Sequence, residues 1–156
     1  MAEAGSGAVD GPASAAIDRL LDGARVAIEP RAEPGDLAGV LERGGLVVDI
    51  RPVELRERDG LIPGALVVGR NVLEWRLDPT SPHRLPEVRG RDQEMVIVCD
   101  EGYASSLAAA TLRQLGLGRV TDLAGGFQAW RREAEAGRIA VPAVTPTASA
   151  EAPAHP

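Results

Sequence analysis

The chain has 156 residues, of which 44% are apolar, and a formal net charge of −6. This length and apolar content suit one folded domain with a buried core, and the acidic balance argues against nucleic acid or an anionic membrane surface as the main partner. We expect no membrane span, because no apolar run reaches the roughly 18 residues that a spanning helix needs, and no signal peptide. A single cysteine cannot form an internal disulfide, so we expect a reducing, cytoplasmic setting.

Hydrophobic periodicity and turn residues predict helices and strands that alternate along the chain. Residues 1–14 are rich in Ala and Gly and 138–156 in Pro and Ala, which predicts disordered tails. In chain order we expect a helix at 15–24, a strand at 24–28, a helix at 34–43, a strand at 46–50, a helix at 53–58, a strand at 65–68, a helical turn at 71–77, a strand at 95–98, a helix at 105–115, a strand at 120–123 and a helix at 127–136. The segment 15–33 is then a helical extension with an edge strand, and 34–137 is the main domain.

This alternation is typical of right-handed βαβ units, so we expect an α/β domain with a mostly parallel sheet and helices on both faces. Ligands of such sheets bind at the carboxyl ends of the strands. Cys99, the only cysteine, directly follows the apolar run 95–98 and therefore lies at that edge.

The residues after Cys99 form a short polar loop that leads into a helix beginning near Ser105. A strand, a tight loop and a helix N-terminus present backbone N–H groups toward one point, which attracts anions and favours a thiolate over a thiol. Gly102 permits the backbone curvature that this requires. The alternative is that Cys99 is a small buried residue ending a strand.

Three segments in order resemble the signatures of rhodanese-like domains. They are Asp49-Ile50-Arg51, then Glu54, then Gly60-Leu61-Ile62-Pro63-Gly64-Ala65; the loop Cys99-Asp100-Glu101-Gly102-Tyr103-Ala104-Ser105; and Leu123-Ala124-Gly125-Gly126-Phe127-Gln128-Ala129-Trp130. The resemblance implies a three-layer fold with a five-stranded, mostly parallel sheet. It also implies transfer of sulfane sulfur through a cysteine persulfide.

The resemblance assigns roles to individual residues. Cys99 is the nucleophile, and a thiol or another nucleophile removes the sulfur from its persulfide. The substrate-binding residues are expected to be Asp100, Glu101, Gly102, Tyr103, Ala104, Ser105 and Arg70. We expect a small donor such as thiosulfate or a persulfide, a thiol acceptor that can belong to a protein, no cofactor and no metal. Ser105 and Ser106 are expected either to cap the helix or to donate hydroxyl groups to the bound sulfur. Asp49 and Arg51 are expected to form a structural ion pair.

The loop also departs from the family pattern. Rhodaneses commonly carry an Arg where this chain has Ala104, and Asp100 and Glu101 add two carboxylates whose charge opposes an incoming dianion. We therefore expect weak thiosulfate:cyanide activity and a neutral or protein-bound donor. One alternative is a catalytically silent binding or regulatory module. Another is a Cys-dependent phosphatase or arsenate reductase, which needs an Arg at the position of Ser105.

Overall fold

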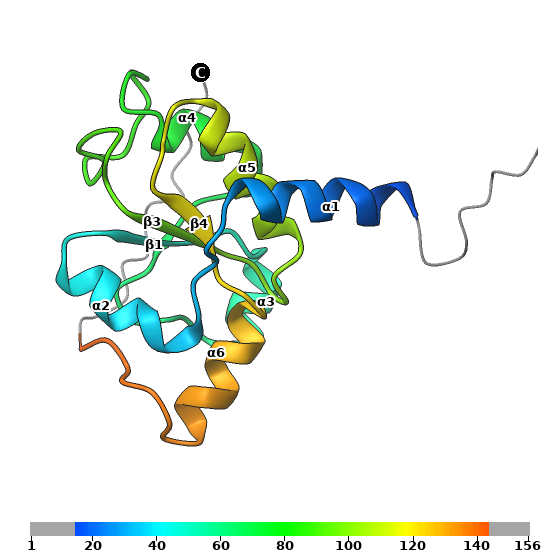
Figure 1. The fold of residues 1–156 in the computed structure, drawn as a ribbon. Coiled ribbons are helices and arrows are strands. Elements are labelled where there is room, and N and C mark those ends of the chain that lie inside the picture. The colour runs from blue at the N-terminus through cyan, green and yellow to red at the C-terminus, as the bar shows by residue number, and fades with distance from the viewer. Residues whose placement is uncertain (1–14, 144–156) are drawn as a thin grey trace, which may run out of the picture.

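The computed structural model describes residues 15–143 (Figure 1), so the predicted N-terminal tail and most of the predicted C-terminal tail lie outside the described residues. A four-stranded sheet with the order β2-β1-β3-β4 forms the centre, and every neighbouring pair of strands is parallel. The strands are β1 Leu46–Asp49, β2 Leu66–Val67, β3 Met95–Val98 and β4 Val120–Asp122. Their carboxyl ends therefore meet at one edge of the sheet.

Helices cover both faces of this sheet. They are α1 Ala16–Ala27, α2 Leu37–Glu42, α3 Val53–Asp59, α4 Leu73–Leu77, α5 Ala104–Gln114 and α6 Gly126–Glu135, with short 3₁₀ turns η2 Pro34–Asp36 and η3 Arg70–Val72. The expected α/β fold with a parallel sheet and helices on both faces is confirmed. In the described residues no helix is long and apolar enough to cross a membrane.

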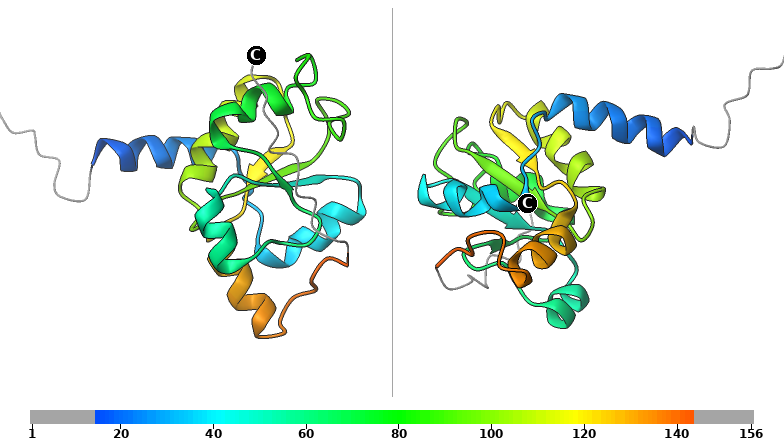
Figure 2. Two further views of the ribbon diagram at one scale, coloured as in Figure 1. Left: turned by 180° about the vertical axis from the view of Figure 1, so that it is seen from behind. Right: turned by 60° about the horizontal axis from the view of Figure 1, so that its bottom comes forward.

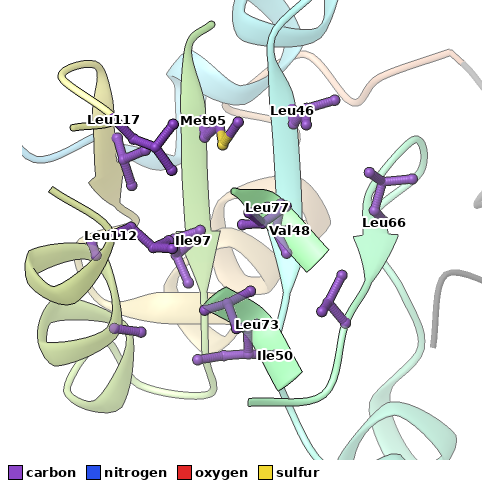
Figure 3. Close-up of a cluster of buried hydrophobic side chains, with 14 of the residues drawn as sticks. Leu46, Val48, Ile50, Leu66, Leu73, Leu77, Met95, Ile97, Leu112 and Leu117 are labelled. Atoms are coloured by element: carbon purple, nitrogen blue, oxygen red, sulfur yellow. The ribbon is translucent and has the colours of Figure 1, made fainter. Parts of the chain in front are cut away.

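Strand alternation sends neighbouring side chains to opposite faces and creates two hydrophobic cores. On one face Val48 and Ile97 pack with Leu73 and Leu77 of α4 and Leu112 of α5 (Figure 3). The other face holds a second buried cluster between the sheet, α2 and α6, made of Ala32, Leu37, Val40, Val47, Ile62, Ala65, Val96, Val98, Leu123, Phe127 and Trp130. These two cores hold the carboxyl ends of β1 and β3 in place.

The predicted edge strand at 24–28 is wrong, because α1 continues to Ala27. Ala24 and Ile28, four residues apart, are both buried, so the helical period of the apolar residues outweighs the β propensity of Val26 and Ile28. Instead of a fifth strand, Ala32 alone forms a parallel bridge with Leu123 beside β4. Across residues 15–143 the sheet thus has four strands rather than five, with one bridging residue in the place of the fifth.

Helix α1 leaves the body of the domain as an arm, as the views in Figures 1 and 2 show. It contacts α5, and Ala24 near its C-terminal end is buried. Ile17 and Leu20 near its start remain 55% and 60% exposed. The arm therefore meets the domain through its C-terminal half, close to the loop that follows β3.

Candidate active site

Cys99 lies directly after β3, and its side chain is 7% exposed. Its Sγ accepts hydrogen bonds from the backbone N–H of Gly102 at 3.2 Å and of Ser105 at 3.3 Å. Ser105 belongs to the first turn of α5, where backbone N–H groups lack partners within the helix. The loop and the helix start thus aim two amides at the sulfur, which favours negative charge there.

Gly102 must be a glycine for two independent reasons. Its φ of +89° lies in the left-handed region, and a Cβ atom at this position would approach the backbone nitrogen of Gly125 to 2.8 Å. Across the same contact, a Cβ atom on Gly126 would lie 2.6 Å from the carbonyl carbon and oxygen of Asp100. The two glycines therefore let the Cys99 loop and the start of α6 pack backbone against backbone.

A buried polar network lies behind the sulfur. The Cys99 thiol donates to Ser105 Oγ at 3.1 Å, and Ser105 Oγ donates to Asp122 Oδ2 at 2.7 Å. Ser106 Oγ donates to the same carboxylate oxygen at 2.8 Å. Ser105, Ser106 and Asp122 are all 0% exposed. Ser105 therefore contacts both the sulfur and Asp122, whereas Ser106 contacts Asp122 and not the sulfur. Neither serine side chain caps α5, so that alternative is wrong.

Two arginines outside the predicted main domain complete this network. Arg31 contacts both oxygens of Asp122, through Nε at 2.8 Å and Nη2 at 3.1 Å, and Nη2 also donates to the Gly102 carbonyl at 3.0 Å. Arg25 of α1 donates to the same carbonyl at 2.7 Å and to Ser106 Oγ at 3.1 Å, and it lies over the Tyr103 ring at 5.3 Å. The N-terminal extension thus fixes the loop from behind.

A cavity of about 400 Å³ opens in front of Cys99. Its lining consists of Ile50, Arg51, Pro52, Arg70, Cys99, Asp100, Glu101, Tyr103 and Ala104. The Arg70 side chain is 40% exposed and binds Glu74 one helical turn away at 3.0 Å. No guanidinium comes from the loop itself. Of the two arginines that line the cavity, Arg51 and Arg70, only Arg70 is exposed, and its charge is partly offset by Glu74.

The two loop carboxylates have different surroundings. Asp100 Oδ1 accepts a hydrogen bond from Gln128 Nε2, which also donates to Asp59, whereas Glu101 is exposed. Two hydrogen bonds, the stronger effect coming from Arg58 and the weaker from Gln128, hold the pKa of Asp59 well below its ordinary value. This bridge ties the loop to α3 and α6.

The predicted pairing of Asp49 and Arg51 is confirmed. Both side chains are fully buried, with an N–O distance of 2.7 Å, and Arg51 also donates to the Gly60 carbonyl. Its guanidinium stacks on the Phe127 ring at 3.7 Å. The pair braces the exit of β1, where Arg51 contributes to the wall of the cavity.

All seven residues predicted around Cys99 belong to the site. Five of them line the cavity that Cys99 also lines, and the backbone N–H groups of Gly102 and Ser105 donate hydrogen bonds to its sulfur. Sequence reasoning missed Asp122, Arg25 and Arg31. A carboxylate at the end of a predicted parallel strand is a signal that points to Asp122. Arg25 and Arg31 carry no comparable signal, because they contact the loop across 71 or more residues of chain. Within residues 15–143 no group of three metal-ligating side chains occurs.

Comparison with known proteins identifies relatives that are similar in sequence. The chain is 40% identical to a sulfurtransferase of Allochromatium vinosum over 88 residues, which cover 56% of this chain and 72% of the relative. It is 32% identical to the thiosulfate sulfurtransferase GlpE of Pseudomonas aeruginosa over 101 residues, covering 65% of this chain and 83% of the relative.

Solved structures agree with these matches. A Rhodopseudomonas palustris protein described as of unknown function and a possible tyrosine phosphatase superposes with a TM-score of 0.67 and 33% identity, covering 85% of this chain and 97% of the other. The human single-domain sulfurtransferase TSTD1 superposes with a TM-score of 0.57 and 25% identity, covering 67% and 96%. The family model of the rhodanese-like domain matches residues 33–133. The chain therefore belongs to the rhodanese-like domain family.

Proposed function

We propose that this protein is a sulfurtransferase that carries sulfane sulfur as a persulfide on Cys99. The main support is the pair of amides, from Gly102 and Ser105, that converge on a cysteine sulfur facing a cavity. Such a site stabilises both an ionised cysteine and an ionised persulfide. The names of the relatives, sulfurtransferase and thiosulfate sulfurtransferase, support the same class of reaction.

The reaction has two displacement steps. In the first, the ionised Cys99 sulfur attacks the sulfane sulfur of the donor, a new S–S bond forms, and the leaving group departs with the electron pair of the broken bond. In the second, a thiol or another nucleophile attacks the outer sulfur and Cys99 leaves as a thiolate. The backbone N–H groups of Gly102 and Ser105 stay in place throughout. These hydrogen-bond donors therefore do not have to move as negative charge returns to the Cys99 sulfur.

The charges around the cavity favour a neutral or protein-bound donor over thiosulfate. Ala104, Asp100 and Glu101 all line the cavity; the side chain of Ala104 is a methyl group, and Asp100 and Glu101 each carry a carboxylate. Two charges about 6 Å apart interact by roughly 2–3 kcal/mol at an effective dielectric constant near 20. Arg70 offsets this repulsion only in part, because it is paired with Glu74. We therefore infer slow loading by thiosulfate and faster loading by a cysteine persulfide.

The mass of the intact protein tests this proposal. Protein exposed to a cysteine persulfide is expected to gain one sulfur atom, protein exposed to thiosulfate to gain less in the same time, and Cys99→Ser to gain none. Failure to gain sulfur from either donor would contradict the proposal and favour a silent binding module.

The phosphatase description belongs to the Rhodopseudomonas protein, and here Ser105 stands where Cys-dependent phosphatases need Arg. No hydrolysis of p-nitrophenyl phosphate is therefore expected.

A further inference from the structure

Asp122 is a buried carboxylate whose position controls the Ser105 hydroxyl. It lies at the carboxyl end of β4, is 0% exposed, and accepts hydrogen bonds from Ser105, Ser106 and Arg31. Arg31 contacts both carboxylate oxygens in the bidentate geometry of a guanidinium–carboxylate ion pair. An ionised carboxylate accepts hydrogen bonds and has no proton to give.

The number of available protons then fixes the direction of the hydrogen bond at the sulfur. A serine hydroxyl has one proton. Ser105 Oγ lies 2.7 Å from Asp122 Oδ2, which is a charged acceptor, so the hydroxyl proton of Ser105 lies in this hydrogen bond. Toward Cys99, 3.1 Å away, Ser105 Oγ presents only a lone pair. It can accept a hydrogen bond from a thiol, but it cannot donate one to a thiolate.

We propose that Asp122 is a positioning residue that, through Ser105, holds the resting Cys99 side chain as a thiol. The two backbone amides stabilise the thiolate, and the Ser105 lone pair opposes them. The balance leaves a protonated sulfur that ionises only as a donor engages it. Ser105 touches the reacting atom, whereas Asp122 and Arg31 act through Ser105.

The other charged and titratable groups near the sulfur do not reverse this balance. They come from the loop (Asp100, Glu101 and Tyr103), from across the cavity (Arg51 and Arg70) and from behind the loop (Arg25). Arg51 and Arg70 are paired with Asp49 and Glu74, and Arg25 donates to a carbonyl and to Ser106. The loop carboxylates add negative charge, which also favours a neutral sulfur.

A resting thiol indicates the class of donor. In the reaction Cys–SH + R–S–SH → Cys–S–SH + R–SH, the bond between Cys99 Sγ and the transferred sulfur forms as the S–S bond of the donor breaks. The electron pair of that bond goes to the leaving sulfur, which also takes the proton that Cys99 gives up, so no outside oxidant or reductant is needed. A thiolate leaving group is a stronger base than sulfite and accepts this proton more readily. The proposed device therefore favours persulfide donors over thiosulfate.

The rate of Cys99 alkylation by iodoacetamide between pH 5 and 10 tests the proposal. In Ser105→Ala the midpoint of the pH–rate profile is expected to move to lower pH by about one pH unit, because the thiol loses its acceptor while the thiolate keeps both amides. Asp122→Asn should move it the same way, since an asparagine NH₂ can donate to Ser105 and turn the hydroxyl proton toward the sulfur. Ser106→Ala is the matched control: it removes an Asp122 donor that does not touch the sulfur, so its midpoint should equal that of the wild type.

A midpoint that rises in Ser105→Ala would show that the hydroxyl donates to a thiolate, and a midpoint that does not move would show a purely structural role. Either result overturns the proposal. If Asp122→Asn does not fold, the comparison of the two serine variants decides alone. The inference rests on the proposed function only for its consequence in catalysis, because alkylation reports the protonation of Cys99 even in a protein that transfers no sulfur. Failure of alkylation to follow the expected profile and failure of sulfur loading are therefore separate results.

Discussion

Arg31→Ala is expected to destabilise the fold far more than an ordinary surface arginine substitution. The variant leaves the Asp122 carboxylate, which is 0% exposed, with two hydroxyl donors and without its cation. Removing one partner of a buried ion pair costs about 3–5 kcal/mol. The Arg31 side chain is 20% exposed, so we expect the lower end, about 3 kcal/mol.

Arg43→Ala is the matched control. Arg43 also binds a carboxylate through two nitrogens, at 3.2 and 3.1 Å to Glu94, but its side chain is 59% exposed. Exposed pairs of this kind contribute about 0.2–1 kcal/mol. The double variant Arg31→Ala/Asp122→Asn should be more stable than Arg31→Ala alone, because it contains no unpaired buried charge.

The assay is urea-induced unfolding followed by tryptophan fluorescence. Of the two tryptophans, Trp130 is buried in the core and Trp75 is 44% exposed, so the change on unfolding reports mainly the exposure of Trp130. Domains of this size unfold with roughly 5–15 kcal/mol, so all the variants can remain folded without denaturant. A difference of less than about 1 kcal/mol between Arg31→Ala and Arg43→Ala would refute the reasoning that Asp122 is a buried charge held by Arg31.

Three further substitutions test other parts of the site. Gly102→Ala should abolish sulfur loading, because its Cβ would lie 2.8 Å from the nitrogen of Gly125. Gly60→Ala is the control and should load normally, because Gly60 has a similar φ of +88° and open space around it. Equal loading of the two variants, measured by intact mass, would contradict this reasoning. Glu101→Gln should speed loading by thiosulfate about fivefold and leave loading by a persulfide unchanged, since it removes one repelling charge. The effect is smaller than roughly 2–3 kcal/mol would give, because Glu101 is exposed and solvent screens its charge; an unchanged thiosulfate rate would argue against repulsion. The wild type should be more stable than Asp59→Asn above the ordinary carboxyl pKa of 3.8, and this difference in unfolding free energy should shrink as the pH falls below 3.8, because the pKa of Asp59 is lowered in the folded state. Urea titrations at several pH values measure the difference. A difference that grows in acid would contradict this expectation.

Local pattern was sufficient to predict the centre of the domain. The apolar, β-branched run Met95–Val98 is a strand with the predicted bounds, because it pairs with strands on both sides and is buried on both faces. The position of Cys99 after this strand and the turn of the backbone at Gly102 involve residues only a few positions apart, so the local sequence was enough to predict them. The same holds for Asp49 and Arg51, two residues apart.

Long-range contacts could not be predicted in this way. Arg25 reaches Ser106 across 81 residues of chain, and Arg31 reaches Asp122 across 91. Val26 and Ile28 indicated a strand, but packing of α1 on α5 kept the segment helical to Ala27. The region that supplies both arginines also precedes residues 33–133, which match the family model. The support behind the loop is thus a property that only the folded chain displays.

Sulfur transfer in a single turnover tests the central claim most directly. Protein is loaded with a cysteine persulfide, separated from the donor and mixed with a small thiol, and the masses of the protein and the thiol are followed together. We predict that the protein loses one sulfur atom as the thiol gains one, and that Cys99→Ser neither loads nor transfers. A protein that loads no sulfur at Cys99, or that keeps it in the presence of excess thiol, would contradict the proposal that this cysteine carries sulfur between two substrates.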